Sequence, residues 1–256
     1  MKKFFALALA MVMALSCLSA CSKKDSDNGN NNSGDNSDTI KIGMLGPYTG
    51  DTAVYGLAVK NGAMLYIDSV NAAGGINGKK LQVLSYDNKA DDAEAVNAFT
   101  RLVDEGIVGL VGDVLTSNTI AVVGEAYPIN MPMVTASATA AAVTYDADSN
   151  TVYPNVFRAC FIDPFQGEKM AEYAKQILNV SSAAVIYETG SDYSSGLSEA
   201  FVAKCKELGI TVVDQEGYAT GDVDFKAQLA NIAKANPDVI FCPNYYQDNG
   251  MIVTQA

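Results

Sequence analysis

Histidine is missing from the 256-residue chain, and both cysteine and basic residues are scarce. Without histidine the chain lacks the commonest general base and the commonest metal ligand. The 17 basic residues are outnumbered by 29 acidic ones, which gives a formal charge of −12. An acidic surface repels the phosphates of nucleic acid, so we expect no nucleic-acid partner. We therefore predict a protein that is not an enzyme and that has no metal site and no cofactor.

Beyond the N-terminal segment, no apolar run is long enough to cross a membrane. At the N-terminus, Lys2 and Lys3 precede twelve apolar residues, Phe4 to Leu15. Such a run is typical of a signal peptide and short for a membrane span. It ends in Leu18-Ser19-Ala20-Cys21. This sequence resembles the lipobox of bacterial lipoproteins, in which the cysteine is acylated and becomes the new N-terminus. Ordinary cleavage after Ala20 is the alternative.

The residues after Cys21 differ sharply in composition from the rest of the chain. Residues 22–38 consist only of Ser, Lys, Asp, Asn and Gly, which bury too little apolar surface to offset the entropy of ordering. We predict a signal peptide over 1–20, a disordered tether over 21–38, and lipid on Cys21. The protein would then be extracytoplasmic and anchored to the cell membrane. Loss of Lys2 and Lys3 would leave a formal charge of −14.

The cysteines outside the signal peptide and lipobox are Cys160, Cys205 and Cys242. Their spacing is not that of metal ligands. All three lie in apolar or helical contexts, so we expect buried free thiols. A disulfide between Cys160 and Cys205 stays open as an alternative, because an extracytoplasmic setting permits one.

From Thr39 onward, short apolar stretches alternate with helical periodicity. The predicted strands cover residues 40–44, 81–86, 107–111, 133–135, 156–160, 183–187, 211–216 and 239–241. The predicted helices cover residues 53–73, 92–105, 117–127, 164–178, 192–208, 225–235 and 246 onward. Residues 136–153 lack periodicity and are predicted as loops. We expect Asp91 and Asp192 to cap their helices. We expect Asn179 and Gly209 to end the helices that precede them.

Alternation of this kind predicts parallel sheets with right-handed crossovers. The units are too many for one sheet, and the pattern breaks near Cys160. We therefore predict an α/β protein with two doubly wound lobes, a first ligand-binding lobe over 39–160 and a second over 161–256. Ligands of such sheets bind beyond the carboxyl ends of the strands, so the loops there hold the candidate site.

Two hydroxyl-rich loops follow neighbouring predicted strands. Residues 112–119 lead into a helix start, where free backbone N–H groups beside hydroxyls suit a carboxylate. A plain N-cap from Thr116, Ser117 or Asn118 is the alternative. Residues 135–139 reach the same sheet edge, and together the two loops would form a polar cradle. A small-residue turn is the alternative for this second loop.

Tyr55, Tyr193 and Tyr245 each lie near the end of a strand-to-helix connection. We predict that they form aromatic walls around a small ligand. Each tyrosine alone would also suit a half-buried surface position. The glycines of residues 43–50 lack the GxGxxG spacing and the lysine of a phosphate loop, so nucleotide binding is not predicted.

Several segments together resemble the branched-chain amino-acid-binding proteins of ABC uptake systems. The most specific is Asn-Ala-Ala-Gly-Gly-Ile-Asn-Gly at residues 71–78. The others are Tyr55-Gly56, Tyr86-Asp87-Asn88, Gly112 with Thr116 and Ser117, Thr135 to Thr139, and residues 190–196. The resemblance runs from about Ile40 to Ala256. It implies a type I periplasmic-binding fold whose two lobes close on the ligand around a hinge.

The resemblance also implies roles for residues of the first lobe. Thr116 and Thr139 would hold the ligand α-carboxylate through hydroxyl and backbone N–H groups. Ser137 would offer its carbonyl to the ammonium group, and Tyr55 would flank the side chain. Family members often carry a small or sulfur-bearing residue at the position of Leu115, which implies a differently shaped pocket here.

In the second lobe, the resemblance implies that Tyr193 and Tyr245 reach the ligand on closure. The acid with which the family binds the ammonium group lies on a later loop, beyond Ala256. Family members also return to the first lobe after that loop. The resemblance therefore implies an incomplete product, truncated at the C-terminus, whose second lobe is short of strands.

These observations predict an extracytoplasmic solute-binding lipoprotein that delivers an amino acid, with branched-chain ones leading, to the permease of an ABC importer. One alternative keeps the fold but binds an amide, urea or a short peptide-like compound. A sensory lipoprotein is a second alternative, and an extracellular enzyme is a distant third.

Overall fold

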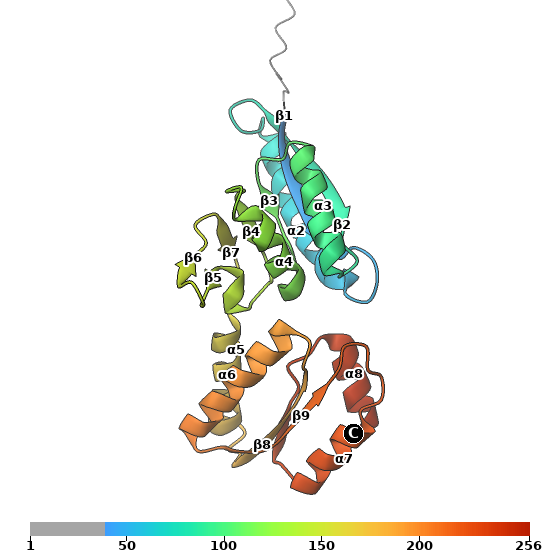
Figure 1. Ribbon diagram of the computed structural model, residues 1–256, viewed down its shortest axis with the longest axis vertical. Helices are drawn as coiled ribbons and strands as arrows, with labels where there is room; N and C mark the ends of the chain where they lie inside the picture. Colours follow the sequence, from blue (N-terminus) through green and yellow to red (C-terminus); the bar gives the residue numbers. More distant parts are fainter. Residues whose placement is uncertain (1–38) are drawn as a thin grey trace, which may run out of the picture. The chain divides into compact units, whose positions relative to one another are not determined.

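The computed structural model describes residues 39–256, which belong to one structural unit. The predicted signal peptide, the tether and Cys21 lie outside the described residues. The described chain forms a five-stranded sheet, a three-stranded sheet and a two-stranded hairpin (Figure 1). None of its helices is both long and apolar enough to span a bilayer.

The five-stranded sheet is parallel, with the strand order β2-β1-β3-β4-β7. Its strands are β1 (Thr39–Gly46), β2 (Lys80–Asp87), β3 (Leu110–Val111), β4 (Met133–Thr135) and β7 (Val156–Arg158). The alternating helices are α2 (Ala53–Ala72), α3 (Asp92–Asp104) and α4 (Thr116–Ala126). The order reverses between β1 and β3, and the loops beyond this switch point are where such sheets bind ligands.

Helices α3 and α4 cover one face of this sheet. Phe99 and Val122 pack with Leu45 and Met133 in a buried cluster. On the other face, an apolar groove remains along β3, β4 and β7, and Phe157 there is 56% exposed. The sheet is therefore buried on one face and only partly covered on the other.

Strand β3 is shorter than the predicted stretch of residues 107–111. The N–H of Ile107 still bonds to the Leu102 carbonyl at the end of α3. The N–H of Val108 then donates to the Lys41 carbonyl in β1, but Val108 is not part of the regular strand pairing, which begins at Leu110. Ile107 and Leu110 of this apolar run are buried, whereas Val108 is 58% exposed, and the first residues of the run complete the helix end.

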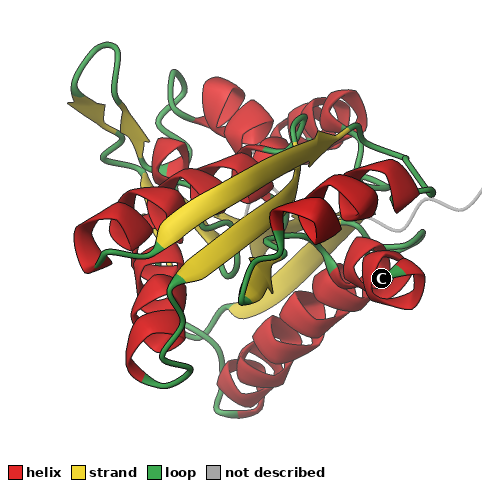
Figure 2. Cartoon of the chain, turned by 90° about the horizontal axis from the view of Figure 1, so that it is seen from below, coloured by secondary structure: helices red, strands yellow, loops and turns green. Residues whose placement is uncertain are grey.

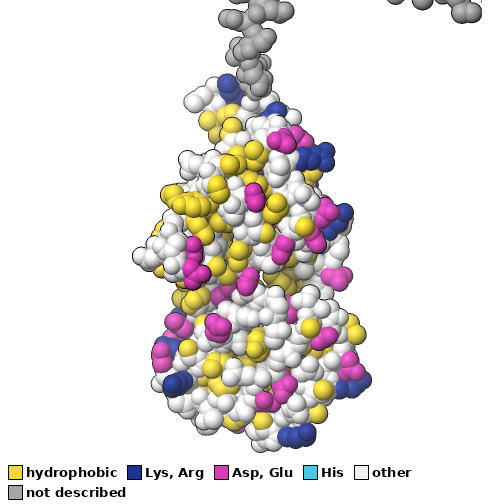
Figure 3. Space-filling model, in the orientation of Figure 1, with side chains coloured by type: hydrophobic (Ala, Val, Ile, Leu, Met, Phe, Trp, Pro, Cys, Tyr) yellow, Lys and Arg dark blue, Asp and Glu magenta, His cyan; other side chains and the backbone are white. Residues whose placement is uncertain are grey.

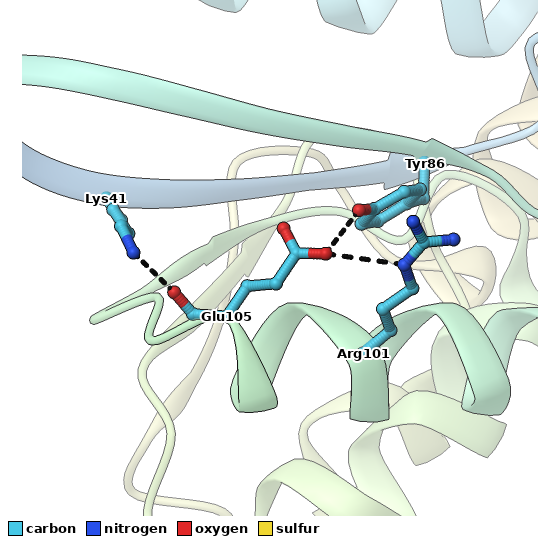
Figure 4. Close-up of polar contacts among 4 residues, drawn as sticks. All are labelled: Lys41, Tyr86, Arg101 and Glu105. Carbon is cyan, nitrogen blue, oxygen red and sulfur yellow. Dashed lines mark hydrogen bonds and ion pairs between the residues drawn. The ribbon is translucent and has the colours of Figure 1, made fainter. Parts of the chain in front are cut away.

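A polar cluster ties the end of α3 to β1 and β2 (Figure 4). The Tyr86 hydroxyl donates to Glu105 Oε1 at 2.5 Å, and Arg101 Nε lies 3.3 Å from the same oxygen. Lys41 Nζ donates to the Glu105 backbone carbonyl at 2.8 Å. The Tyr86 hydrogen bond holds the pKa of Glu105 below its usual value. This cluster fixes the end of α3 against both strands.

The three-stranded sheet is also parallel, with the order β10-β8-β9. Its strands are β8 (Ser182–Glu188), β9 (Thr211–Tyr218) and β10 (Val239–Phe241). Its helices are α5 (Asp163–Gln176), α6 (Asp192–Leu208), α7 (Lys226–Ala235) and α8 (Tyr246–Gln255). In Figure 2 strands run between helices on both sides.

The central strand β8 is buried on both faces, as its continuous apolar run predicts. Ala183 and Val185 pack in one cluster with Phe201 of α6. Ile186 packs in a second cluster with Ile232 of α7. Alternate residues of β8 therefore serve two separate cores, which is the doubly wound arrangement.

Several predicted helix ends are confirmed. The Asp91 side chain accepts from Glu94 N, and Asn179 and Gly209 adopt left-handed backbone angles. The prediction that Asp192 caps α6 is wrong. Ser191 has the extended backbone of the cap position, and its hydroxyl accepts from the N–H of Ser194.

The stretch predicted as loops, residues 136–153, contains short elements. These are η1 (Ala141–Val143), β5 (Tyr145–Asp146) and β6 (Thr151–Val152). Cys160, Cys205 and Cys242 are free thiols, so the Cys160–Cys205 disulfide is not formed. Cys205 is fully buried and the other two are partly buried.

Candidate ligand site

A cavity of about 260 Å³ lies beyond the carboxyl ends of strands from both sheets. Its volume is just below the roughly 300–1,000 Å³ typical of pockets for drug-sized ligands, so it suits a smaller molecule. All seven residues predicted to bind a ligand line it. The full lining is Tyr55, Val114, Leu115, Thr116, Ser137, Thr139, Phe161, Gln166, Tyr193, Asn244 and Tyr245.

The first turn of α4 forms one wall of this cavity. Thr116 is the first residue of the helix and only 2% exposed. The capping role predicted for Thr116, Ser117 or Asn118 is wrong. The extended cap residue is Leu115, and no side chain caps the helix. The N-terminal N–H groups of α4 are therefore left to bind an anionic or polar group.

The loop after β4 is tied to the loop after β3 by two hydroxyl groups. Thr135 Oγ1 donates to the Asp113 carbonyl at 2.7 Å, and Ser137 Oγ donates to the Val114 carbonyl at 2.7 Å. The Ser137 hydroxyl is thus used structurally. By contrast, the Thr139 hydroxyl is buried without a hydrogen-bond partner among the described residues.

Arg158, at the end of β7, braces the loop that carries Thr139. Its guanidinium donates to the carbonyls of Ala138 and Ala140 at 3.0 and 2.9 Å. It also donates to Thr144 Oγ1 at 2.7 Å. These bonds fix the backbone on both sides of Thr139, so the geometry of the loop does not depend on a ligand.

Asp113 supports the wall from behind and is fully buried. Asn88 Nδ2 and the N–H of Val114 each donate to its carboxyl group at 2.5 Å. Burial nevertheless raises the pKa of Asp113 to about 7. This carboxyl group therefore titrates near neutral pH while it holds the turn between β3 and α4.

Three tyrosine rings form the opposite side of the cavity. Tyr193 and Tyr245 stack with ring centroids 5.1 Å apart, and Tyr55 approaches Tyr245 at 5.5 Å. Burial raises the pKa of all three phenols, so they stay neutral. The predicted aromatic wall is thus assembled, with Tyr55 from one sheet and the other two from the second.

Asn244 fixes the backbone before Tyr245, and sequence reasoning missed it. Its Nδ2 donates to the Ile186 carbonyl at 2.9 Å. Its Oδ1 accepts from Ser194 Oγ at 2.8 Å and from the N–H of Glu188 at 3.2 Å. A polar residue three positions after the predicted strand 239–241 was the available signal. Val114, Phe161 and Gln166 were also missed.

A second cavity of about 580 Å³ adjoins the first, since Leu115, Thr116 and Tyr245 line both. Its lining includes five acidic residues and no lysine or arginine. The acidic residues are Asp51, Asp91, Asp92, Glu188 and Asp248. We call this second cavity the acidic vestibule. Acidic side chains are also spread over the face drawn in Figure 3.

The two sides of the site are joined directly by hydrogen bonds. The Tyr246 hydroxyl donates to the Asp51 carbonyl at 3.0 Å, and Gln247 Nε2 donates to the same oxygen. No group of acidic or cysteine side chains in residues 39–256 is arranged to hold a metal ion. The lining offers hydroxyls, backbone N–H groups and aromatic rings to a ligand.

The family model for periplasmic binding proteins matches residues 39–256. The chain belongs to the periplasmic binding protein family. A curated member of this family, the leucine-, isoleucine-, valine-, threonine- and alanine-binding protein of Pseudomonas aeruginosa, is 31% identical over 219 residues. That match covers 86% of this chain and 57% of the relative, so the chain spans little more than half the length of this relative.

Solved structures of periplasmic binding proteins share the fold. The leucine-binding protein LivK of Thermotoga maritima is 32% identical with a TM-score of 0.78. The isoleucine complex of LivJ from Streptococcus pneumoniae is 34% identical with a TM-score of 0.76. Each match covers 85% of this chain and 60% of the other. The resemblance to branched-chain amino-acid-binding proteins and the type I fold are confirmed.

Proposed function

We propose that this periplasmic binding protein is a non-enzymatic receptor for a free amino acid, with branched-chain amino acids as the leading ligands. One observation carries the proposal. The residues that line the 260 Å³ cavity are all uncharged, and they combine hydroxyl groups at a helix start with three tyrosine rings. The Thr116 hydroxyl and the backbone N–H groups of Thr116 and Thr139 would bind the α-carboxylate, and the Ser137 carbonyl would accept from the ammonium group.

The side chain of the ligand would lie between Tyr55, Leu115 and the stacked pair Tyr193 and Tyr245. Since the lining has no cation, a second carboxylate on the ligand would find no ionic partner. The acidic vestibule would further repel anions and attract positively charged groups. We therefore propose that neutral zwitterionic amino acids are preferred over dicarboxylic ones.

For the whole protein, we propose delivery of the amino acid to the permease of an ABC importer. Two lobes, over residues 39–160 and 161–256, would close on the ligand. The Cys21 lipobox and the composition of residues 22–38 support a lipid anchor on the outer side of the cell membrane. The names of the relatives support transport of this ligand class.

The test is a thermal-shift screen followed by calorimetric titration of the purified protein. Leucine, isoleucine and valine are the positive probes, and glutamate, benzoate, urea and a dipeptide are the comparators. We expect saturable binding of one or more branched-chain amino acids and none of glutamate. Binding of urea or the dipeptide, with no response to any amino acid, would replace the proposed ligand class.

A further inference from the structure

Asp163 is the most unusual carboxyl group near the cavity, because it is 1% exposed and has no partner. Neither of its oxygens makes a hydrogen bond within residues 39–256. An ionised carboxylate that is buried and unpaired is costly to the folded protein. Asp163 is the first residue of α5, on the chain that passes from the first sheet to the second. A structural role for this carboxyl group should therefore be visible in its contacts.

The usual structural roles are absent. The cap residue of α5 is Ile162, and no side chain caps the helix. The cation that acts on it is Arg158, which stabilises the Asp163 carboxylate through space. Its guanidinium is hydrogen bonded to the carbonyls of Ala138 and Ala140 and to Thr144. Asp163 therefore neither caps its helix nor forms an ion pair in the described structure.

Its surroundings place it against the ligand site. The N–H of Asp163 donates to the Thr139 carbonyl at 3.0 Å. The Thr139 hydroxyl lies close enough to stabilise the Asp163 carboxylate, yet the two groups do not form a hydrogen bond with good geometry. The negative charge of Asp163 also acts on the hydroxyls of Tyr193 and Tyr245. Thr139, Tyr193 and Tyr245 all line the cavity.

The facing helix leaves room on the other side of the carboxyl group. Gly196 of α6 has no side chain, and a Cβ there would lie 3.5 Å from Asp163 Oδ2. Asp163 also borders a cavity of about 420 Å³ between α5 and α6. Asp163 thus lies directly behind Thr139, next to the lining of the ligand cavity, without being packed tightly by α6.

An ammonium group would satisfy the Asp163 carboxylate and the Thr139 hydroxyl at once. It has three N–H donors and a positive charge, whereas a carboxylate can only accept and a hydroxyl can accept as well as donate. We propose that Asp163, together with the Thr139 hydroxyl, receives the α-ammonium group of the ligand. This assignment rests on the proposed function, and it supplies an acid to the site from within the described chain.

The assignment is tested with a ligand pair that differs only in the ammonium group, leucine and 4-methylpentanoate. Asp163→Asn keeps the shape of the side chain and removes its charge. We expect this variant to bind leucine about tenfold to a hundredfold more weakly, the range for a hydrogen bond to a charged group. Its affinity for 4-methylpentanoate should stay as in the wild type. Glu168→Gln, an exposed residue of the same helix, is the matched control and should leave both affinities unchanged.

Thermal melts without ligand separate this assignment from a structural role. Since Asp163 is unpaired, Asp163→Asn should melt at the same temperature as the wild type or higher. A lower melting temperature, with equal losses for both ligands, would overturn the assignment in favour of a structural role. Unchanged leucine affinity in Asp163→Asn would overturn this assignment but leave the proposed function standing. A wild type that binds no amino acid would overturn the proposed function as well.

Discussion

The ring of Tyr193 lies nearly parallel to the ring of Tyr245, with an interplanar angle of 17° and centroids 5.1 Å apart. The two residues come from different connections of the second sheet, after β8 and after β10. Tyr55, from the first sheet, tilts against the same Tyr245 ring at 52°. Tyr245 therefore contacts aromatic rings from both sides of the cavity.

This position predicts that the ring of Tyr245 contributes more to leucine affinity than its hydroxyl group does. Tyr245→Phe should bind leucine within a fewfold of the wild type. Tyr245→Ala should lose at least about tenfold, since an aromatic pair contributes about 0.5–1.5 kcal/mol beyond the area that it buries. Calorimetric titration measures both, and Tyr173→Ala on the exposed side of α5 is the control. Equal affinities for all three variants would remove the tyrosine wall from the site.

Thr116 is expected to contribute to binding rather than to helix capping, because Leu115 occupies the cap position. Thr116→Ala should weaken leucine binding by about 1.5–3 kcal/mol, the value of a hydrogen bond to a charged group. Its melting temperature should change little, and Thr116→Ser should be mild in both measurements. A lower melting temperature with unchanged affinity would show that Thr116 only stabilises the fold.

The pH dependence of binding is predicted by Asp163, since burial raises the pKa of its carboxyl group to about 6. The Thr139 hydroxyl and Arg158 favour its ionised form, and its charge in turn raises the pKa of Tyr193 and Tyr245. Cys160 also lies between Arg158 and Asp163 and is influenced by both charges. Because only the ionised form attracts an ammonium group, leucine affinity should rise as the pH rises through about 6. Titrations between pH 5 and pH 8 should show no such rise in Asp163→Asn.

The free energy of unfolding of the unliganded protein should change with pH in the direction opposite to the leucine affinity. A free aspartate has a pKa of about 3.9, so between about pH 4 and pH 6 the folded protein binds more protons at Asp163 than the unfolded one. Its contribution to the free energy of unfolding therefore falls as the pH rises through that window. Asp113, with a pKa of about 7, should lower the free energy of unfolding in the same way as the pH rises further, toward 7. Chemical denaturation of wild type and Asp163→Asn across this range separates the two groups.

The apolar groove along β3, β4 and β7 predicts self-association of residues 39–256. Exposed contiguous apolar surface favours contacts between molecules, and Phe157 is its most exposed aromatic residue. Phe157→Lys should lower the apparent mass in light scattering at high concentration without lowering the melting temperature by more than a few degrees. Val213→Lys, on the exposed side of β9, is the control. A monomeric wild type at all concentrations would contradict this prediction.

The predicted lipid anchor depends on Cys21, which lies outside the described residues. Cys21→Ser should release the protein from membranes or block its maturation, whereas Ser22→Ala should leave both unchanged. Membrane fractionation and mass spectrometry of the mature N-terminus are the measurements. An unmodified N-terminus in the wild type would remove the anchor.

The residue pattern alone predicted the alternation of strands and helices and the loops that hold the candidate site. Each depends on local information. The apolar run of β8 and the turn residues Asn179 and Gly209 carry it, and the family resemblance added the identity of seven cavity residues. The sequence also indicated an aromatic wall, because Tyr55, Tyr193 and Tyr245 follow strand ends that meet at sheet edges.

The packing of the whole chain sets which polar groups have hydrogen-bond partners. Whether Thr116 caps α4 depends on the backbone angles of Leu115, and these are set by the loops packed around it. In the sequence Asp163 is one more acid at a helix start. Its lack of a partner follows from where Arg158 and Thr139 lie in space, 5 and 24 residues away along the chain. Burial and hydrogen bonding are properties of the whole packed chain, so local patterns cannot reveal an unpaired carboxylate.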